Sequence, residues 1–237
     1  KHLPSLLKIA VLQPIAYFTC ETFGIQMTTA SESGSIIACI PIASLVASIL
    51  FLQKKPTRFQ TSGICLTVVG VIVCVTAKGF ESSFSGIGYI MLCMAVLSYS
   101  LYCVSAEKAD KTTSIEKTYV MIACGACFFA TMAIARSIAA DTVVDLFMLP
   151  FQNTVFLFSI LYLGIASSVL SFVLFNISIS SIGTNKASSF VGISTAVSVL
   201  AGVFILDEKF SAMQCYGTLI ILLGVYIANM KSRFFWR

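Results

Sequence analysis

Apolar runs of about 20 residues, separated by short polar turns, restrict the fold of this chain more than any other feature. Only 11% of the residues are charged and 58% are hydrophobic, whereas a soluble domain carries about 25% charged residues. A membrane β-strand would instead alternate polar and apolar residues over about ten positions. Because a helix also satisfies its own peptide groups in lipid, we predict an all-α membrane protein, a helical bundle.

We predict eight transmembrane helices, each close to the length of about 20 residues that crosses the hydrocarbon layer. The predicted spans are residues 9–29, 34–52, 61–77, 86–105, 118–137, 155–179, 187–206 and 212–230. The connections between them are short and contain Gly, Pro, Ser and Asn, which favour turns. None of these connections is long or polar enough to form a separate soluble domain.

Basic residues are distributed unevenly between the two ends of these spans. If the N-terminal end is cytoplasmic and the spans alternate, twelve of the fifteen Lys and Arg residues fall on the cytoplasmic side. They are Lys1, Lys8, Lys54, Lys55, Arg58, Lys108, Lys111, Lys117, Lys186, Lys231, Arg233 and Arg237. Cytoplasmic loops carry an excess of Lys and Arg, so we predict a multi-pass protein of the plasma membrane (a bacterial inner membrane) with both ends cytoplasmic. This topology accounts for the net charge of +5 without nucleic acid as a partner.

One pattern of residues occurs twice, 154 positions apart, from Gln60 to Gln214. The other matched pairs include Lys55 and Lys209, Gly63 and Gly217, Gly70 and Gly224, and Phe18 and Phe172. The predicted spans 9–29 and 155–179 correspond, yet they start on opposite sides of the membrane. The two copies are therefore predicted to be inverted, as in many secondary transporters.

An odd number of helices in each copy explains the inversion. We predict two inverted five-helix repeats, with residues 81–237 holding all five helices of the second repeat. Residues 1–80 then hold only the last three helices of the first repeat. On this interpretation two further helices precede Lys1 in the full-length protein.

Glu21 is the only acidic residue that we place deep in a predicted span. A charged group at that depth is costly, so it is expected to face protein or water and is often functional. It lies at helical spacing with Gln13, Tyr17, Gly24 and Thr28. Two interpretations follow: a cavity-lining carboxylate that binds a cation, an amino group or a proton, or a structural hydrogen bond to a neighbouring helix.

Other polar or small residues at mid-span complete the set of candidates for substrate binding. The candidates are Glu21, Tyr17, Pro41, Ser44, Tyr99, Ser171, Asn176 and Thr195. Pro41 is expected to remove a backbone hydrogen bond in the middle of span 34–52, although small residues there also suit close helix packing. Tyr99 is deep enough to face a cavity, whereas Tyr102 suits the aromatic belt at the membrane surface.

Several absences restrict the function further. No Lys or Arg is expected at mid-membrane, which favours a neutral, zwitterionic or cationic organic solute over one rich in phosphate. No glycine-rich phosphate loop occurs, so an ATP motor within the chain is not expected. Cys124 and Cys127 have the spacing of a metal or redox pair, but they lie mid-helix without a nearby His. We therefore expect no metal and no cofactor.

The doubled pattern resembles the EamA-domain drug/metabolite transporter superfamily. The resemblance rests on Gln-x-x-Gly followed by Gly-Val in both copies, on the turn Leu206–Lys209, and on Ser98–Tyr102. The first copy has Leu52-Gln53-Lys54-Lys55 at this turn and lacks the acidic residue of the family. The resemblance implies a ten-helix carrier that exports or exchanges small metabolites or drugs by alternating access, but it does not specify the substrate.

Two other classes of function were weighed against a carrier. An intramembrane enzyme would need clustered acid and base groups, and one glutamate without a histidine is poor material for that chemistry. A non-transporting scaffold or sensor would not need polar stripes in both copies. The expected partners of a carrier are a small-molecule substrate and the lipid bilayer, with H⁺ or Na⁺ as the candidate coupling ion; a homodimer is left open.

Overall fold

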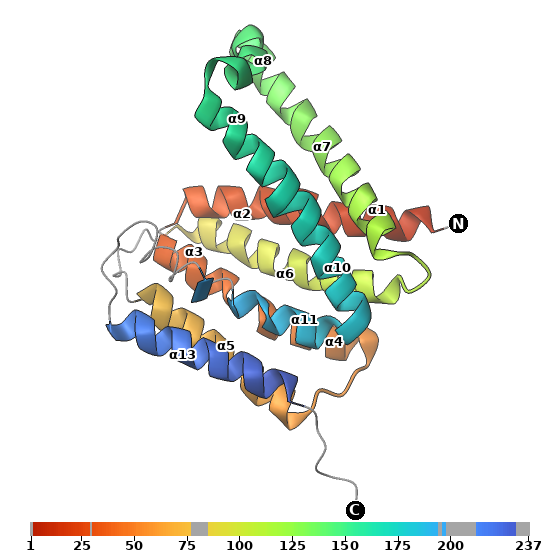
Figure 1. The fold of residues 1–237 in the computed structure, drawn as a ribbon, viewed down its shortest axis with the longest axis vertical. Coiled ribbons are helices and arrows are strands. Elements are labelled where there is room, and N and C mark those ends of the chain that lie inside the picture. Colours follow the sequence, from red (N-terminus) through yellow and green to blue (C-terminus); the bar gives the residue numbers. More distant parts are fainter. Residues whose placement is uncertain (1, 29, 77–84, 194–195, 198–211, 231–237) are drawn as a thin grey trace, which may run out of the picture.

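The computed structural model of the chain describes residues 2–28, 30–76, 85–193, 196–197 and 212–230 (Figure 1). Every element in these ranges is helical, so the predicted all-α class is confirmed. Five helical segments among these residues are long and apolar enough to cross a membrane. They are Leu3–Gln26, Gly86–Lys108, Ser114–Ala139, Thr154–Ile182 and Ala212–Asn229.

The first half of the chain forms three helical rods, two of which are irregular. The first rod consists of α1 (Leu3–Ala10), the π-helical η1 (Val11–Ala16) and α2 (Tyr17–Gln26). The second is divided into α3 (Ala30–Ile37) and α4 (Ile40–Leu52), and the third is α5 (Arg58–Thr76). The second half contains α6 (Gly86–Lys108), α7 (Ser114–Ala139), α8 (Val143–Gln152), α9 (Thr154–Leu161), η2 (Tyr162–Leu170), α10 (Ser171–Ile182), α11 (Thr184–Ser189) and α13 (Ala212–Asn229).

These bounds correct the sequence analysis in two places. Pro41 does not interrupt the middle of one continuous helix, because α3 ends at Ile37 and Pro41 lies in the first turn of α4. A proline is tolerated there, since the first N–H groups of a helix have no partner in the helix. The structure also contains α8, for which no helix was predicted. Most of predicted span 187–206 lies outside the described residues, so the count of eight spans stays a prediction.

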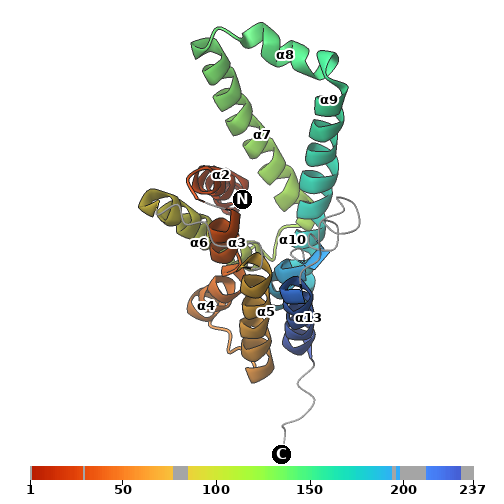
Figure 2. The same ribbon diagram turned by 90° about the vertical axis from the view of Figure 1, so that its left-hand side faces the viewer.

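Most of the helices lie side by side in layers, and two rise away from them (Figure 2). In the layers, α6 packs against both α2 and α4, and α5 packs along α13. The two rising helices are α7 and α9, which α8 joins at their far ends. This arm exposes large apolar side chains, among them Phe147, Phe151, Val155 and Phe158. Such a surface suits contact with lipid.

Glycines make the contact between α5 and α13 close enough for backbone to touch backbone. A Cβ atom on Gly63 would lie 2.3 Å from the Ala228 nitrogen, and one on Gly70 would lie 2.7 Å from the Ile221 nitrogen. The contacts made by Gly217 and Gly224 are equally close. These glycines therefore allow the two helices to pack closely, and the order of the partners makes the helices antiparallel.

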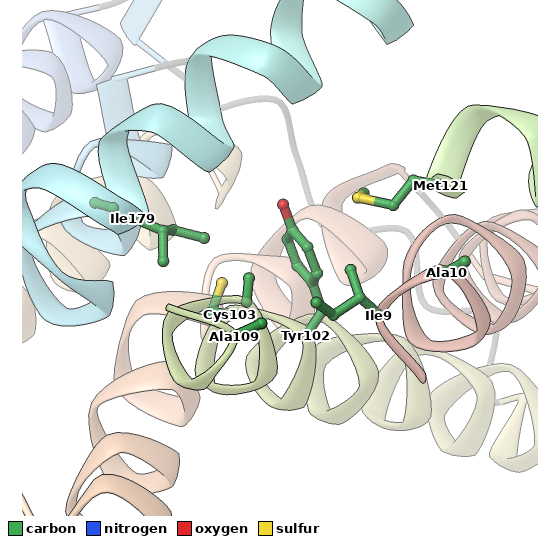
Figure 3. Packing of buried hydrophobic residues seen from close by; sticks show 9 residues of the cluster. Ile9, Ala10, Tyr102, Cys103, Ala109, Met121 and Ile179 are labelled. Atoms are coloured by element: carbon green, nitrogen blue, oxygen red, sulfur yellow. The ribbon is translucent and has the colours of Figure 1, made fainter. Parts of the chain in front are cut away.

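A buried cluster joins α1, α6, α7 and α10 below the arm (Figure 3). At its centre lies Tyr102, which is only 1% exposed and has Ile9, Met121 and Ile179 around it. The expectation that Tyr102 belongs to an aromatic belt at the membrane surface is therefore wrong. Helices from distant parts of the sequence cover it, which its position near a helix end could not reveal.

Candidate functional site

Tyr17 and Glu21 form a hydrogen-bonded pair on α2. They are four residues apart, so they lie on one face of the helix, and the Tyr17 hydroxyl donates a hydrogen bond to Glu21 Oε1 at 2.7 Å. Tyr17 is 7% exposed, whereas Glu21 is half-buried. The carboxylate that the sequence singled out is thus oriented by a neighbour on its own helix.

The predicted stripe runs from Gln13 in η1 along α2 to Thr28 just beyond it, and its members Tyr17 and Gly24 contact α6. Gln13 is 2% exposed, and its Oε1 atom is buried without a hydrogen-bond partner among the described residues. A Cβ atom on Gly24 would lie 2.6 Å from Leu92 Cγ, so α2 and α6 approach closely there. At the end of the stripe, Thr28 donates to the Gly24 carbonyl at 2.8 Å.

Aromatic rings extend from Tyr17 across α6 to α10. The rings of Tyr17 and Tyr99 have centroids 5.3 Å apart, in an edge-to-face arrangement. Tyr99 also contacts Tyr102, at 5.7 Å, and Phe175, at 5.8 Å. Phe18 on α2 also stacks directly on Phe172 on α10, which is its matched position in the second copy. Their ring centroids are 6.2 Å apart. We call Tyr17, Phe18, Tyr99, Tyr102, Phe172 and Phe175 the aromatic layer.

Asn176 lies at the end of this layer in a buried hydrogen-bond network. Tyr102 donates to Asn176 Oδ1 at 3.0 Å, and Asn176 Nδ2 donates to Thr118 Oγ1 at 3.0 Å and contacts Met121 Sδ at 3.5 Å. The residue has 0% exposure. Since both its polar atoms form hydrogen bonds to neighbouring helices, Asn176 holds α6, α7 and α10 together.

A small hollow adjoins the aromatic layer between α2, α7 and α10. Its volume is about 230 Å³, and its lining is largely apolar, with Pro14, Phe18, Phe129 and Phe172 among its walls. Ser168 supplies a hydroxyl there. Glu21 does not line this hollow but lies one turn along α2 from Phe18. The arrangement places apolar space beside a carboxylate.

The remaining predicted residues that the structure describes are Ser44 and Pro41, on α4, and Ser171, on α10. Ser44 is fully buried between α4 and α6, where its hydroxyl donates to Ser100 Oγ at 3.4 Å, and Pro41 is buried at the start of α4. Ser171 is exposed and donates to the Ala166 carbonyl at 3.2 Å, within the π-helical turn. Thr195 lies outside the described residues. The structure thus connects Glu21, Tyr17, Tyr99 and Asn176 through hydrogen bonds and ring contacts.

A polar contact that the sequence analysis missed joins α4, α6 and α11 at their ends. Lys54, just beyond α4, forms an ion pair with Glu107 Oε1, and Glu107 Oε2 accepts from the Thr184 backbone N–H at 3.0 Å. The Thr184 hydroxyl donates to the Cys103 carbonyl at 3.0 Å. Gly183, with φ of 81°, allows this close approach, because a Cβ there would lie 3.2 Å from Glu107 Oε1. We call Lys54, Glu107 and Thr184 the clamp.

The clamp contains the only Lys–carboxylate ion pair among the residues that the structure describes. No group of three His, Cys, Asp or Glu side chains in those same residues could hold a metal ion. A carboxylate beside aromatic rings and a polar contact between helix ends suit binding and movement.

Comparison with known proteins gives a consistent result. Residues 1–76 and 86–230 match the profile of the EamA-like transporter family. The uncharacterized transporter YcxC of Bacillus subtilis is 33% identical over 233 residues, which cover 98% of this chain and 74% of that protein. An uncharacterized transporter of Archaeoglobus fulgidus is 23% identical over 236 residues, which cover 98% and 79%. One crystal structure shares the fold at 14% identity, with a TM-score of 0.75 over 94% of this chain and 76% of the other.

Proposed function

Because this chain belongs to the EamA-like transporter family and is therefore a multi-pass membrane transporter, we propose that it is a secondary carrier working by alternating access. Its proposed cargo is a small neutral, zwitterionic or cationic organic solute. Glu21 is proposed to bind the amino group of that solute or the coupling proton. The observation that carries this proposal is the Tyr17–Glu21 pair at the edge of the aromatic layer.

The electrostatics of the pair favour a cation as its partner. One oxygen of Glu21 accepts from Tyr17, and the other accepts no hydrogen bond from the residues that the structure describes. No Lys or Arg among those residues forms an ion pair with it. The faces of aromatic rings attract cations, by about 0.5–1 kcal/mol at exposed sites and about 2 or more when water is excluded. An ammonium group would thus gain from both the carboxylate and the rings.

The contacts of α5 with α13 support the inverted repeat on which the proposed alternating access rests. Gly63 meets the Gly224 carbonyl, and Gly70 meets the Gly217 carbonyl. Under the 154-residue shift, Gly63 corresponds to Gly217 and Gly70 to Gly224, so the matched positions exchange partners across the interface. Exchange of this kind is what a two-fold axis produces. Because backbone touches backbone here, we assign α5 and α13 to a fixed contact rather than a sliding one.

The clamp is proposed as the gate at one end of the pathway. It joins Lys54, from the first predicted repeat, to Glu107 and Thr184, from the second. In the predicted topology this end is cytoplasmic. The conformation described is then closed toward the cytoplasm, and the release of the clamp would accompany the opening of that side.

Flux through the full-length protein in liposomes tests the proposal. A thermal-shift screen of amino acids, quaternary ammonium ions, polyamines and neutral sugars selects the solutes, and each is then followed under an H⁺ or a Na⁺ gradient. We expect Glu21→Gln to slow uptake by about tenfold or more, since a lost charge-assisted contact costs about 1.5–3 kcal/mol. Asp145→Asn, on the exposed helix α8, is the matched control and should transport normally.

Two results would contradict the proposal in different ways. If no solute of the screen moves under either gradient, the chain is not a carrier of this class of solute. If Glu21→Gln transports as fast as the wild type, with the same dependence on the gradient, the carboxylate has no part in binding or coupling.

A further inference from the structure

A polar hollow lies at the turn between α6 and α7; it shares Glu107 with the clamp, and Glu21 does not line it. Its volume is about 370 Å³. The groups in its lining that matter here are Lys111, Lys117, Ser114, Ser180, Glu107 and Asp110. It lies where two candidate membrane spans end and begin, at Lys108 and Ser114, which is the expected depth of lipid headgroups.

Lys117 is the most unusual group of this hollow. Its side chain carries an ammonium group although the residue is only 2% exposed. The ammonium has three N–H donors, and Nζ donates to the Ala106 carbonyl at 2.7 Å. Among the described residues no other acceptor bonds to it. A buried donor without an acceptor is costly, more so when it is charged, so the remaining N–H groups need an acceptor from outside.

The carboxylates near Lys117 either have other hydrogen-bond partners or accept no hydrogen bond from its ammonium group. Both oxygens of Glu107 are used, by Lys54 and by the Thr184 N–H. Glu116 Oε2 accepts from the backbone N–H of Thr113 at 2.7 Å and from its hydroxyl at 3.0 Å, which caps α7.

Asp110 interacts electrostatically with Lys117 without a hydrogen bond to it. Lys54 neutralises the charge of Glu107. The other charged groups of the lining are Asp110, Lys111 and Lys117, and their net charge is +1.

The shape of the lining suits an anion with several oxygens. Ser114 is the first residue of α7, a helix of 26 residues, whose N-terminal N–H groups favour negative charge. Its hydroxyl lies 3.4 Å from that of Ser180 on α10, so donors from two helices converge beside Lys117. Glu116 offsets part of this field through its cap on α7. The buried ammonium is thus the main attraction, and the hydroxyls fix orientation.

We infer that this hollow binds a singly charged phosphate group, with Lys117 as its principal donor and Ser114, Ser180 and Lys111 around it. The group is either the phosphodiester of a membrane phospholipid or free inorganic phosphate. Its position at headgroup depth makes a phospholipid the natural source, because the acyl chains could extend along the apolar surface of α7 and α10. The inference does not depend on the identity of the transported solute.

Native mass spectrometry of the full-length protein in detergent tests this site. The probes are phosphatidylglycerol, diacylglycerol with the same acyl chains, and inorganic phosphate. We expect wild type to retain phosphatidylglycerol at about tenfold lower concentration than diacylglycerol, and Lys117→Met to lose that preference. Lys117→Arg should keep most of it. Lys108→Met is the matched control, because Lys108 lies over the Phe51 ring, 5.9 Å from its centroid, and is outside the hollow's lining.

The outcomes separate the two sources of phosphate. If inorganic phosphate binds in a Lys117-dependent way and phosphatidylglycerol does not, the site is one for free phosphate. If Lys117→Met binds phosphatidylglycerol and inorganic phosphate as tightly as the wild type does, the inference is overturned. Should Lys117→Met fail to fold, the double variant Ser114→Ala with Ser180→Ala keeps the buried ammonium. That variant must still weaken phosphate binding by about threefold or more for the inference to stand.

Discussion

The clamp offers the sharpest test of how this transporter would move, through the substitution Glu107→Gln. Glutamine has nearly the same shape, and its amide oxygen can still accept from the Thr184 N–H. It removes the negative charge that faces Lys54. The change therefore weakens one defined contact between the two predicted repeats and leaves the packing around it in place.

The exposures of the two partners decide the size of the effect. The Lys54 side chain is 48% exposed and that of Glu107 is 15% exposed. A fully exposed pair contributes about 0.2–1 kcal/mol, whereas hydrogen bonds to a charged, buried group contribute about 1.5–3 kcal/mol. A pair between these limits should contribute about 1.4 kcal/mol, which corresponds to a tenfold change in the ratio of closed to open states.

A native cysteine behind the clamp can report this change. Cys103 is 0% exposed, and its carbonyl accepts the hydrogen bond of the Thr184 hydroxyl at 3.0 Å. We would replace the other eight of the nine cysteines. We would then measure the rate at which Cys103 reacts with a small, membrane-impermeant thiol reagent. We expect Glu107→Gln to raise this rate by about tenfold when the reagent reaches the Lys54 end.

Lys55→Gln is the control, because Lys55 is exposed next to Lys54 but forms no ion pair with any residue that the structure describes. An unchanged rate in Glu107→Gln would refute the assignment of the clamp as a gate. An equal acceleration in Lys55→Gln would also refute it, because the loss of any nearby charge would then be enough.

Three further predictions concern the contacts that support the site. Gly63→Ala should lower the free energy of unfolding by about 1–3 kcal/mol, because its Cβ would overlap the α13 backbone, whereas Gly164→Ala should not, because its Cβ would meet no atom of the described residues within 4 Å; thermal unfolding in detergent compares them. Asn176→Leu and Tyr102→Phe should each destabilise the protein, and their double-mutant cycle should give a coupling of about 0.6–1.7 kcal/mol; additive effects would contradict the network. Tyr17→Phe removes the hydroxyl that donates to the carboxylate on α2, and it should slow flux in the liposome assay by about threefold to tenfold; unchanged flux would show that this hydrogen bond does not orient the group.

The sequence predicted the helices well because their signal is local. The length of an apolar run determines where a helix can cross a membrane, so the predicted spans 86–105 and 118–137 coincide with α6 and α7 within a few residues. The break between α3 and α4 and the π-helical turns η1 and η2 were not predicted. Such irregularities depend on how neighbouring helices pack, which composition does not record.

The roles of individual polar residues were harder to predict, because they depend on partners far away in the sequence. Glu21 and Tyr17 are four residues apart, so helical spacing alone placed them together. Asn176 was also predicted from its position within a span, but its hydrogen-bond partners are Tyr102 and Thr118, on α6 and α7. The clamp unites positions 54, 107 and 184, and no local pattern could connect them.

Two buried polar atoms, on α4 and α11, bear on why a gate at the clamp could open. Ser48 Oγ on α4 and Asn185 Oδ1 on α11 are buried without hydrogen-bond partners among the described residues, and these two helices pack together. Each such group costs about 1–3 kcal/mol while it is kept from water. If the clamp is the gate, opening would hydrate both atoms and so offset the loss of the ion pair. The free energies of the closed and open states would then differ by only a few kcal/mol. A carrier that populates both states needs such a small difference. Replacing Ser48 with alanine removes one of these costs, so it should favour the closed state and slow the modification of Cys103, opposite to Glu107→Gln.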